Sequence, residues 1–341
     1  MKKLRVLILM HHYLVPPEDV SGADPTTAEW RTEYDVLSTI RDGLQHDTRA
    51  LGVRDELGGI RQAIEEFKPD IAFNLLEAFH EIGTFDQNVV SYLELLRQPY
   101  SGCNPRGMIL ARDKALSKKL LHYHRIRVPE FFVVERGRKV RVPRKLSFPL
   151  IVKSLTQEAS IGISQASVVE DLSKLRERVQ FIHESTQTDA IVEQYIEGRE
   201  LYCAIVGNQR LQAFPVWEMT FANMPDGQRR IATERVKWSR KYQEKVGIAT
   251  AAATGLPEGL SDEVQHISRR AYKVLQMSGY ARIDLRLGAD GKIYVIEANA
   301  NPQIAKTEDF AQSAIVTGVD YPALLQSILA AGLRWEPERQ G

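Results

Sequence analysis

The sequence is poor in the features that mark disulfide scaffolds, zinc sites and membrane proteins. Its 341 residues include only two cysteines, Cys103 and Cys203, which lie far apart and lack CxxC spacing, so neither a disulfide framework nor a zinc site is indicated. No run approaches the roughly 18 apolar residues that span a bilayer. The apolar segment 4–10 is interrupted by Arg5 and has no cleavage site after it. We expect a buried strand there instead of a signal peptide, and a cytoplasmic protein without membrane contact.

An excess of charge of one sign is also missing. The chain has 45 Lys and Arg against 44 Asp and Glu, for a net charge of +1, so it offers no broad basic surface and we expect no nucleic-acid partner. Hydrophobic residues make up 43% and charged residues 26%, which is typical of globular proteins. The length exceeds that of one compact core and predicts two or three domains.

The first part of the chain alternates short apolar strands with helical patterns. Strands are predicted at 6–10, 48–53 and 71–75, and helices at 27–44 and 58–67. This alternation predicts an α/β fold class with a small parallel sheet. We expect this first domain to comprise residues 1–104.

The remainder reads as two further units. A second, mixed unit at 105–196 has predicted helices at 112–122 and 172–183 and strands at 131–134, 149–153 and 190–196. The third unit, 197–341, has hairpins, a basic loop at 226–245, a long helix at 261–278 and a final strand pair.

That final strand pair carries the sharpest chemical signal. Asp290-Gly291 predicts a two-residue hairpin turn. Pairing outward from the turn gives three cross-strand pairs: Arg286 with Val295, Asp284 with Glu297, and Arg282 with Asn299. Two carboxylates directly across a pair repel unless a cation lies between them, and oxygen ligands suit Mg²⁺ or Mn²⁺. The alternative is a solvent-facing hairpin in which an arginine neutralises the acids.

Lysines and small residues upstream suit phosphate binding. Lys114 and Lys118 lie one helical turn apart, and Lys153 ends an apolar strand. Each is a candidate phosphate ligand or, alternatively, a surface lysine. The loop 157–164, which includes Gly162, could let backbone N–H groups approach an anion. The segment 191–200 could offer its backbone to an adenine edge and an acid to the ribose.

The order of these segments resembles the D-alanyl-D-alanine ligase branch of the ATP-grasp superfamily over nearly the whole chain. The matching segments are 73–80, 98–102, 112–118, 150–154, 159–162, 192–196, 281–284 and 297–302. The resemblance implies an ATP-grasp fold with an N-terminal Rossmann-like parallel α/β domain, a central mixed domain and a C-terminal antiparallel-sheet domain. It also implies ATP, two Mg²⁺ ions (Mn²⁺ being possible), small-molecule substrates and a homodimer.

The resemblance also implies roles for individual residues. The phosphate ligands would be Lys114, Lys153 and, from a mobile loop, Lys237. The adenine contacts would be Glu193, Tyr195 and Ile196, with Glu200 at the ribose. The metal ligands would be Asp284, Glu297 and Asn299. Arg282 would offset negative charge during acyl transfer, and the loop from Ser160 to Gly162 would exclude water.

On the substrate side the chain departs from the family pattern. Glu29 resembles the glutamate that holds the first substrate's amino group, after an insertion at 11–24. His80 falls at a substrate-site histidine and either contacts ligand or is a loop residue. The family's linked serine and tyrosine correspond to Ala159 and Trp238. The family's carboxylate-gripping serine is replaced by Thr307 with Glu308 and Asp309, which would repel a carboxylate and attract a cationic amine.

These features together predict an ATP-dependent carboxylate-amine ligase. ATP would convert the carboxylate to an acyl phosphate, which an amine then attacks, and the substrates would differ from two D-alanines. Three alternatives stay open: a genuine D-alanine--D-alanine ligase, an ATP-grasp phosphotransferase and a nucleotide-binding protein without activity.

Overall fold

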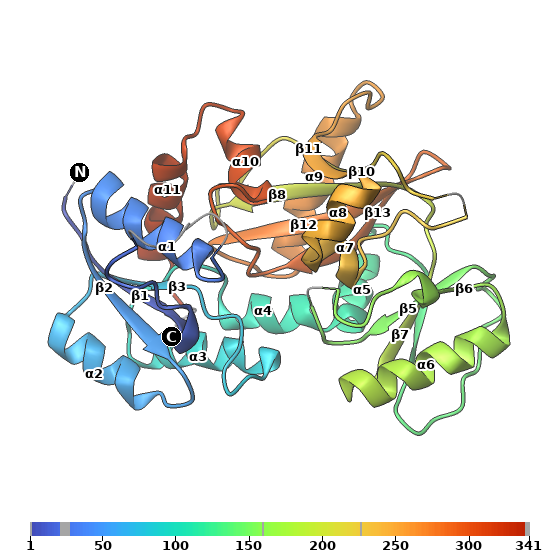
Figure 1. Ribbon diagram of the computed structural model, residues 1–341, viewed down its shortest axis with the longest axis horizontal. Helices are drawn as coiled ribbons and strands as arrows, with labels where there is room; N and C mark the ends of the chain where they lie inside the picture. The colour runs from blue at the N-terminus through green and yellow to red at the C-terminus, as the bar shows by residue number, and fades with distance from the viewer. Residues whose placement is uncertain (1, 21–27, 159, 226, 338–341) are drawn as a thin grey trace.

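The computed structural model describes residues 2–20, 28–158, 160–225 and 227–337, and Figure 1 shows their arrangement. Their strands form three sheets, one parallel and two antiparallel. The predicted α/β fold class is confirmed. Asp24 and Ala159, which fall in segments singled out above, lie outside the described residues.

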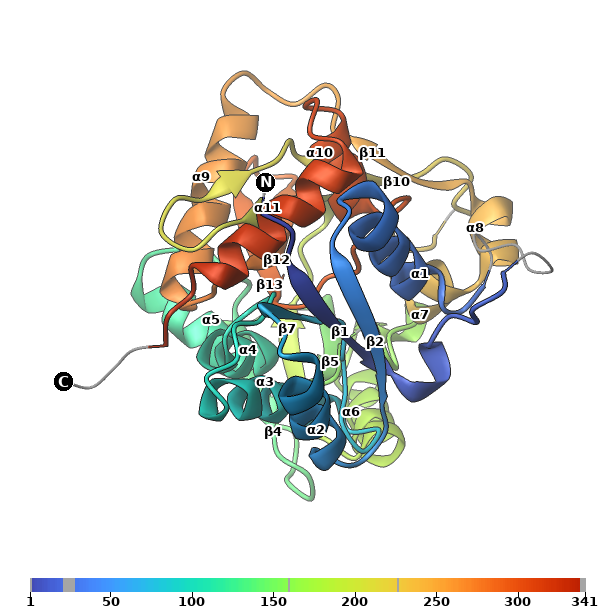
Figure 2. The ribbon, with the colours of Figure 1, turned by 90° about the vertical axis from the view of Figure 1, so that its left-hand side faces the viewer.

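The first sheet is parallel, with strand order β2-β1-β3. Its strands are β1 (Arg5–His11), β2 (Asp47–Val53) and β3 (Ile71–Asn74), and α2 (Gly58–Phe67) joins the last two. Alternate residues of β1 enter two different hydrophobic cores, because a parallel strand is covered on both faces. One core includes α2 and α3 (Asp86–Leu95). The other includes α1 (Arg31–Ser38) and α11 (Tyr321–Leu333), as Figure 2 shows from the side.

The second sheet is antiparallel, with strand order β4-β7-β5-β6. The strands are β4 (Phe131–Val134), β7 (Ala190–Gln194), β5 (Leu150–Ser154) and β6 (Val168–Val169), and α6 (Leu172–Thr186) packs on them. The helix predicted at 112–122 is confirmed as α5 (Lys114–Tyr123), which begins two residues later than expected, whereas α4 (Pro105–Arg112) before it was not predicted. The two helices are separate because the Asp113 side chain caps α5, accepting the N–H groups of Ala115 and Leu116, both at 2.9 Å.

The third sheet has the order β11-β10-β8-β12-β13, with β9 paired to β8. Its strands are β8 (Gly198–Val206), β9 (Gln212–Ala213), β10 (Trp217–Phe221), β11 (Ile248–Ala252), β12 (Tyr280–Gly288) and β13 (Ile293–Asn299). Helix α9 (Leu260–Val274) shares a core with β8 and β12. The pocket described below is lined by side chains on the other face of β12.

Two further departures from the expected pattern concern helices. The basic stretch predicted as a loop contains α7 (Glu234–Trp238) and α8 (Arg240–Val246), capped by Thr233 and Ser239. After β13 the chain forms α10 (Asp309–Ile315) before α11. Short helical turns complete the described elements: His12–Leu14, Thr39–Gly43, Gly83–Phe85 and Gln165–Ser167. None of the described helices is long and apolar enough to cross a membrane.

Candidate active site

The hairpin of β12 and β13 places the predicted polar pairs side by side. Asp284 is opposite Glu297 and Arg282 is opposite Asn299, as expected. The third predicted pair is wrong, because the register shifts between Asp284 and Leu285, so Arg286 is opposite Tyr294 instead of Val295.

The register shift is a β-bulge that changes what β13 presents to its surroundings. Val295 is opposite Leu285 and enters the hydrophobic core with it. The extra residue, Ile296, offers its carbonyl to the Lys118 ammonium. Arg286, two residues from Asp284 on β12, stays on the pocket side with it.

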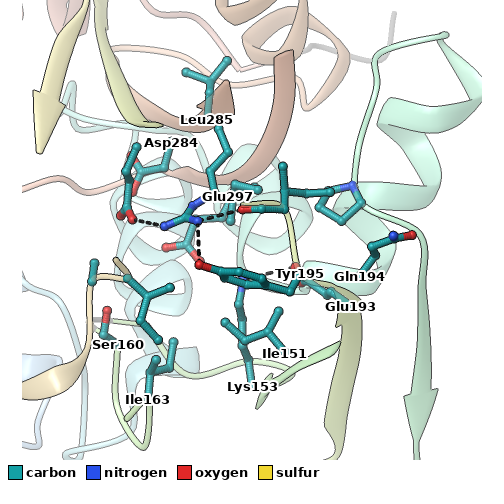
Figure 3. A pocket seen from close by; sticks show the side chains of 17 residues that line it. Ile151, Lys153, Ser160, Ile163, Glu193, Gln194, Tyr195, Asp284, Leu285 and Glu297 are labelled. Atoms are coloured by element: carbon teal, nitrogen blue, oxygen red, sulfur yellow. Dashed lines mark hydrogen bonds and ion pairs between the residues drawn. The ribbon is translucent and has the colours of Figure 1, made fainter. Parts of the chain in front are cut away.

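A pocket lies between the second and third sheets, and Figure 3 shows its side chains. Three elements supply most of its polar groups: β5, β7 with the segment after it, and the β12-β13 hairpin. The polar groups that carry the argument are Lys153, Glu193, Tyr195, Glu200, Asp284, Arg286 and Glu297. Apolar side chains such as Ile151, Ile163 and Ile231 fill the remainder. An apolar cleft with a few converging charged groups is typical of a small-molecule site.

A buried ion triad stands at the base of this pocket. Glu193 is 1% exposed and lies 3.3 Å from Lys118 Nζ and 3.1 Å from Lys153 Nζ. Burial alone would raise the pKa of Glu193, but the two lysine charges outweigh it and lower the pKa. Burial lowers the pKa of Lys118. The triad has two ammonium groups against one carboxylate, so Glu193 is fully compensated and one positive charge is left over at the pocket floor.

Lys118 is the residue of this triad whose importance sequence reasoning underrated. It is 1% exposed, so the interpretation as a surface lysine is wrong for it. Its spacing of four residues from Lys114 puts both lysines on one helix face, which was the available signal. Lys114 is also buried, and its Nζ lies 3.7 Å from Glu297 Oε2 and donates to the Gln157 carbonyl at 2.7 Å.

Arg286 organises the end of the pocket that the resemblance assigns to adenine and ribose. Its guanidinium donates to the Ile196 carbonyl at 2.7 Å and to Glu200 at 3.0 Å. It also lies 5.5 Å from the centre of the Tyr195 ring, within range of a cation-π contact. Sequence reasoning gave Arg286 only the task of neutralising the hairpin acids. The structure instead pairs it with the predicted ribose residue.

The predicted metal ligands converge, and cations lie close to them. Arg282 donates to both oxygens of Asp284, at 2.7 and 2.9 Å. The Asn299 side-chain oxygen accepts the N–H of Asn301 at 3.0 Å. The alternative of arginine neutralisation is therefore partly realised, but the hairpin is not solvent-facing, because Asp284 is only 8% exposed.

The donor chemistry of these groups fits Mg²⁺. All of the candidate ligands are carboxylate or amide oxygens, the type that Mg²⁺ prefers. Within the described ranges no cluster of three or more His, Cys, Asp or Glu forms a self-sufficient metal site. An ion held by two carboxylates would need water and phosphate oxygens to complete its shell, as is common for Mg²⁺ in phosphoryl-transfer sites.

Two loops approach the pocket from opposite sides. Ser160 lines it and has a left-handed backbone with φ of 60°, and Gly162 has φ of 71°. Conformations of this kind cost energy for a residue other than glycine and concentrate at functional sites. Lys237 and Trp238 belong to α7 on the other side, but their side chains lie outside the described part of the chain.

The predicted substrate-side residues are less well placed than the nucleotide-side ones. His80 and Glu29 are both exposed, and neither lines the pocket. Glu308 forms an ion pair with Arg31. Asp309 starts α10 and is close enough to Arg282 to raise its pKa.

A residue that sequence reasoning missed, Glu33, is the buried acid of α1. It is 5% exposed, and its Oε2 atom has no hydrogen-bond partner among the described residues. Burial raises its pKa to about 7. Its spacing from Val36 and Ile40, three and seven residues on, matches the buried face of a helix, and that spacing could have identified it.

Further acids stand near Glu33. Glu77 keeps exposed surface, but the surrounding chain desolvates its carboxyl and raises the pKa to about 7, with Glu158 and Glu33 adding to the effect. Asp86, 1% exposed, has a pKa raised to about 7 by burial although it pairs with Arg112. This acidic cluster, Glu33, Glu77, Asp86 and Glu158, lies beside the end of β13, because Asn301 donates to the Leu76 carbonyl at 3.1 Å.

Comparison with known proteins agrees with this architecture. The family model described as "D-ala D-ala ligase C-terminus" matches residues 120–330. A D-alanine--D-alanine ligase of Desulfotalea psychrophila is 33% identical over 290 residues, which cover 82% of this chain and 84% of that protein.

Two solved structures show the same fold. The D-alanine--D-alanine ligase of Bacillus anthracis complexed with ATP has a TM-score of 0.72 at 24% identity, covering 97% of this chain and 98% of that one. The VanG D-Ala:D-Ser ligase of Enterococcus faecalis has a TM-score of 0.70 at 16% identity, covering 97% and 100%. Given the extent of the family match and the identity to the Desulfotalea protein, the chain belongs to the D-alanine--D-alanine ligase family of ATP-grasp enzymes, which form carbon-nitrogen bonds.

Proposed function

We propose that this enzyme joins a carboxylate to an amine at the expense of ATP, through an acyl phosphate, and that its substrates differ from two D-alanines. One observation carries the first half of the proposal. Lys153, Asp284 and Glu297 meet in one pocket, with Lys114 3.7 Å from Glu297. Lysines beside paired carboxylates are what a magnesium nucleotide requires.

Different residues of the pocket bind the metal ions, the phosphates, the adenine and the ribose. Asp284, Glu297 and Asn299 would hold two Mg²⁺ ions, which when bound disperse charge between the β- and γ-phosphates. Lys114 and Lys153 bind phosphate oxygens, and Lys237 would add a third lysine from α7. Tyr195, Ile196 and Glu193 border the adenine, and Glu200, oriented by Arg286 at 3.0 Å, accepts the ribose hydroxyls.

Arg282 acts at the second step. Its guanidinium lies 4.7 Å from the centre of the Tyr202 ring and is held by Asp284, so its orientation is fixed before substrate arrives. A fixed cation stabilises the negative charge that develops on the tetrahedral oxygen when the amine attacks. Ser160 lines the pocket, and the loop from Ser160 to Gly162 excludes water from the acyl phosphate.

The acidic cluster supports the second half of the proposal. It contains four carboxyls, two of which, Asp86 and Glu158, pair with Arg112. The Glu33 Oε2 atom is buried and has no hydrogen-bond partner within the described part of the chain. An excess of carboxyls favours cationic substrates and opposes the entry of a second free carboxylate. We expect an amine substrate with more positive charge than D-alanine carries.

An isotope experiment tests this function. The enzyme is supplied with ATP, Mg²⁺, amines and a carboxylic acid labelled with ¹⁸O in the carboxyl group. A ligase acting through an acyl phosphate yields ADP, an amide and inorganic phosphate that carries one ¹⁸O atom. ADP with a stable phosphoryl ester would instead identify a phosphotransferase, and no ADP with any substrate would contradict both. The homodimer implied by the resemblance stays a prediction, which the molar mass in solution checks.

A further inference from the structure

Two loops from different sheets meet over the pocket. The first, residues 155–167, joins β5 to β6 and contributes Ser160 and Ile163 to the lining. The second, residues 227–233, precedes α7 and contributes Ile231 and Ala232. Because the pocket lies between them, any bond that ties one loop to the other also closes the pocket.

Gln165 makes one such tie with both ends of its amide group. Its Nε2 donates to the Arg229 carbonyl at 2.9 Å, and its Oε1 accepts the Arg229 N–H at 2.8 Å. The side chain therefore pairs with the second loop as a neighbouring strand residue would. The Arg229 guanidinium in turn lies 5.4 Å from the centre of the Tyr195 ring, which lines the pocket.

Glu234 makes the second tie. Its carboxylate accepts the Gly162 N–H at 3.0 Å, and its own N–H donates to the Ile163 carbonyl at 2.9 Å. Arg178 of α6 holds the same loop in place by donating to the Gly162 carbonyl and to Ser167 Oγ. The two ties thus contact a loop that is already anchored to the second sheet.

We propose that Gln165 and Glu234 are positioning residues that form a two-point latch, which holds these loops together over the bound nucleotide. The inference rests on the proposed function. The Glu234 contact with Gly162 is exposed and the two Gln165 bonds are partly buried. A single hydrogen bond contributes little net free energy, so the latch opens for nucleotide entry and product release.

The test compares Gln165→Ala and Glu234→Ala with the unsubstituted enzyme. Calorimetry measures the affinity for a non-hydrolysable ATP analogue with Mg²⁺, and product analysis measures the ADP formed per amide. We expect each variant to bind the analogue about 2- to 10-fold more weakly and to release more ADP per amide, because water reaches the acyl phosphate. Glu234→Gln keeps an acceptor oxygen and should rescue both readouts.

Gln180→Ala is the matched control, since Gln180 bonds only to Glu184 on the exposed face of α6 among the described contacts. If Gln165→Ala and Glu234→Ala match this control in affinity and in ADP per amide, the latch is wrong while the proposed function stands. If the unsubstituted protein binds no nucleotide, the proposed function fails instead. The double variant should lose less affinity than the two single losses combined, because both ties serve one closure; strict additivity would contradict a joint latch.

Discussion

The proposed nucleotide side and the proposed substrate side of this site differ in how their acidic side chains are paired. On the nucleotide side each acid that lines the pocket has a cation beside it: Glu193 has two lysines, Asp284 has Arg282, Glu200 has Arg286 and Glu297 has Lys114. On the proposed substrate side Glu33 is buried with no partner for its Oε2 atom among the described residues, and Glu77 stands among other acids.

This contrast indicates which half of the site lacks a cation that a ligand would supply. A compensated acid is ready to accept Mg²⁺ with phosphate, which brings its own negative charge. An uncompensated buried acid is costly unless a ligand neutralises it. We therefore interpret the nucleotide side as preorganised and the substrate side as completed by a cationic substrate. Four substitutions test this contrast, in order of decreasing expected effect.

Removing a buried cation from the compensated side should cost the most. Lys118→Met leaves the Glu193 Oε1 atom facing an apolar side chain and should lower the free energy of unfolding by about 4 kcal/mol, measured by urea denaturation. Lys119→Met is the matched control, because Lys119 is the adjacent residue and is exposed. Equal stability of the two variants would show that the triad is not a buried ion cluster.

Neutralising Glu33 should remove part of the pH dependence of stability. Its folded pKa of about 7 is above the ordinary 4.5, so the folded protein holds a proton that the unfolded chain loses. Through this group the free energy of unfolding is highest below pH 4.5 and falls by roughly 3 kcal/mol as the pH rises to 7. Glu33→Gln should flatten this fall, measured as the free energy of unfolding across pH 4 to 8. Glu29→Gln, at an exposed position, should leave it unchanged.

Neutralising a predicted metal ligand should impair the reaction more than the fold. Glu297→Gln should lower kcat/KM by about 100-fold and raise the Mg²⁺ concentration for half-maximal rate, because one charged ligand is lost. Asp290→Asn, at the exposed turn of the same hairpin, should change both values less than about twofold. A Glu297→Gln enzyme with normal Mg²⁺ dependence would remove this residue from the metal site.

Glu308 should matter least, although the sequence made it a candidate for amine binding. Because Arg31 already pairs with it at a partly exposed position, Glu308→Gln should alter the free energy of unfolding by less than about 1 kcal/mol. Its effect on the KM of a cationic amine should be smaller than that of Glu33→Gln. The reverse order would move the amine site toward α10.

Much of the nucleotide side could be predicted because its signals are local. The hairpin around Asp290-Gly291 was predicted with Asp284 opposite Glu297, but between the turn and the bulge the register is one residue off, with Leu287 opposite Ile293. The helix spacing of Lys114 and Lys118 places both on one face. The bulge at Ile296 could not be predicted, because it depends on a contact with Lys118, 178 residues away in the chain. For the same reason the pairing of Arg286 with Val295 was wrong.

The substrate side was harder to predict because its residues come from loops and a helix that meet only in the folded chain. Glu29 was predicted from its place in the sequence and its role remains a prediction, whereas Glu33 was not considered and is distinguished by its burial. The closing contacts of Gln165 and Glu234 carry no local signal, since their partners lie 64 and 72 residues away. The predicted roles of Lys237 and Trp238 remain predictions.

A competition between amines tests the central claim most directly. The enzyme is given ATP, Mg²⁺ and D-alanine together with equal concentrations of basic amino acids and diamines, and products are identified by mass. The account predicts that amides of a cationic amine form first and that D-alanyl-D-alanine is a minor product. Formation of D-alanyl-D-alanine at a rate equal to that of the best other product would contradict it.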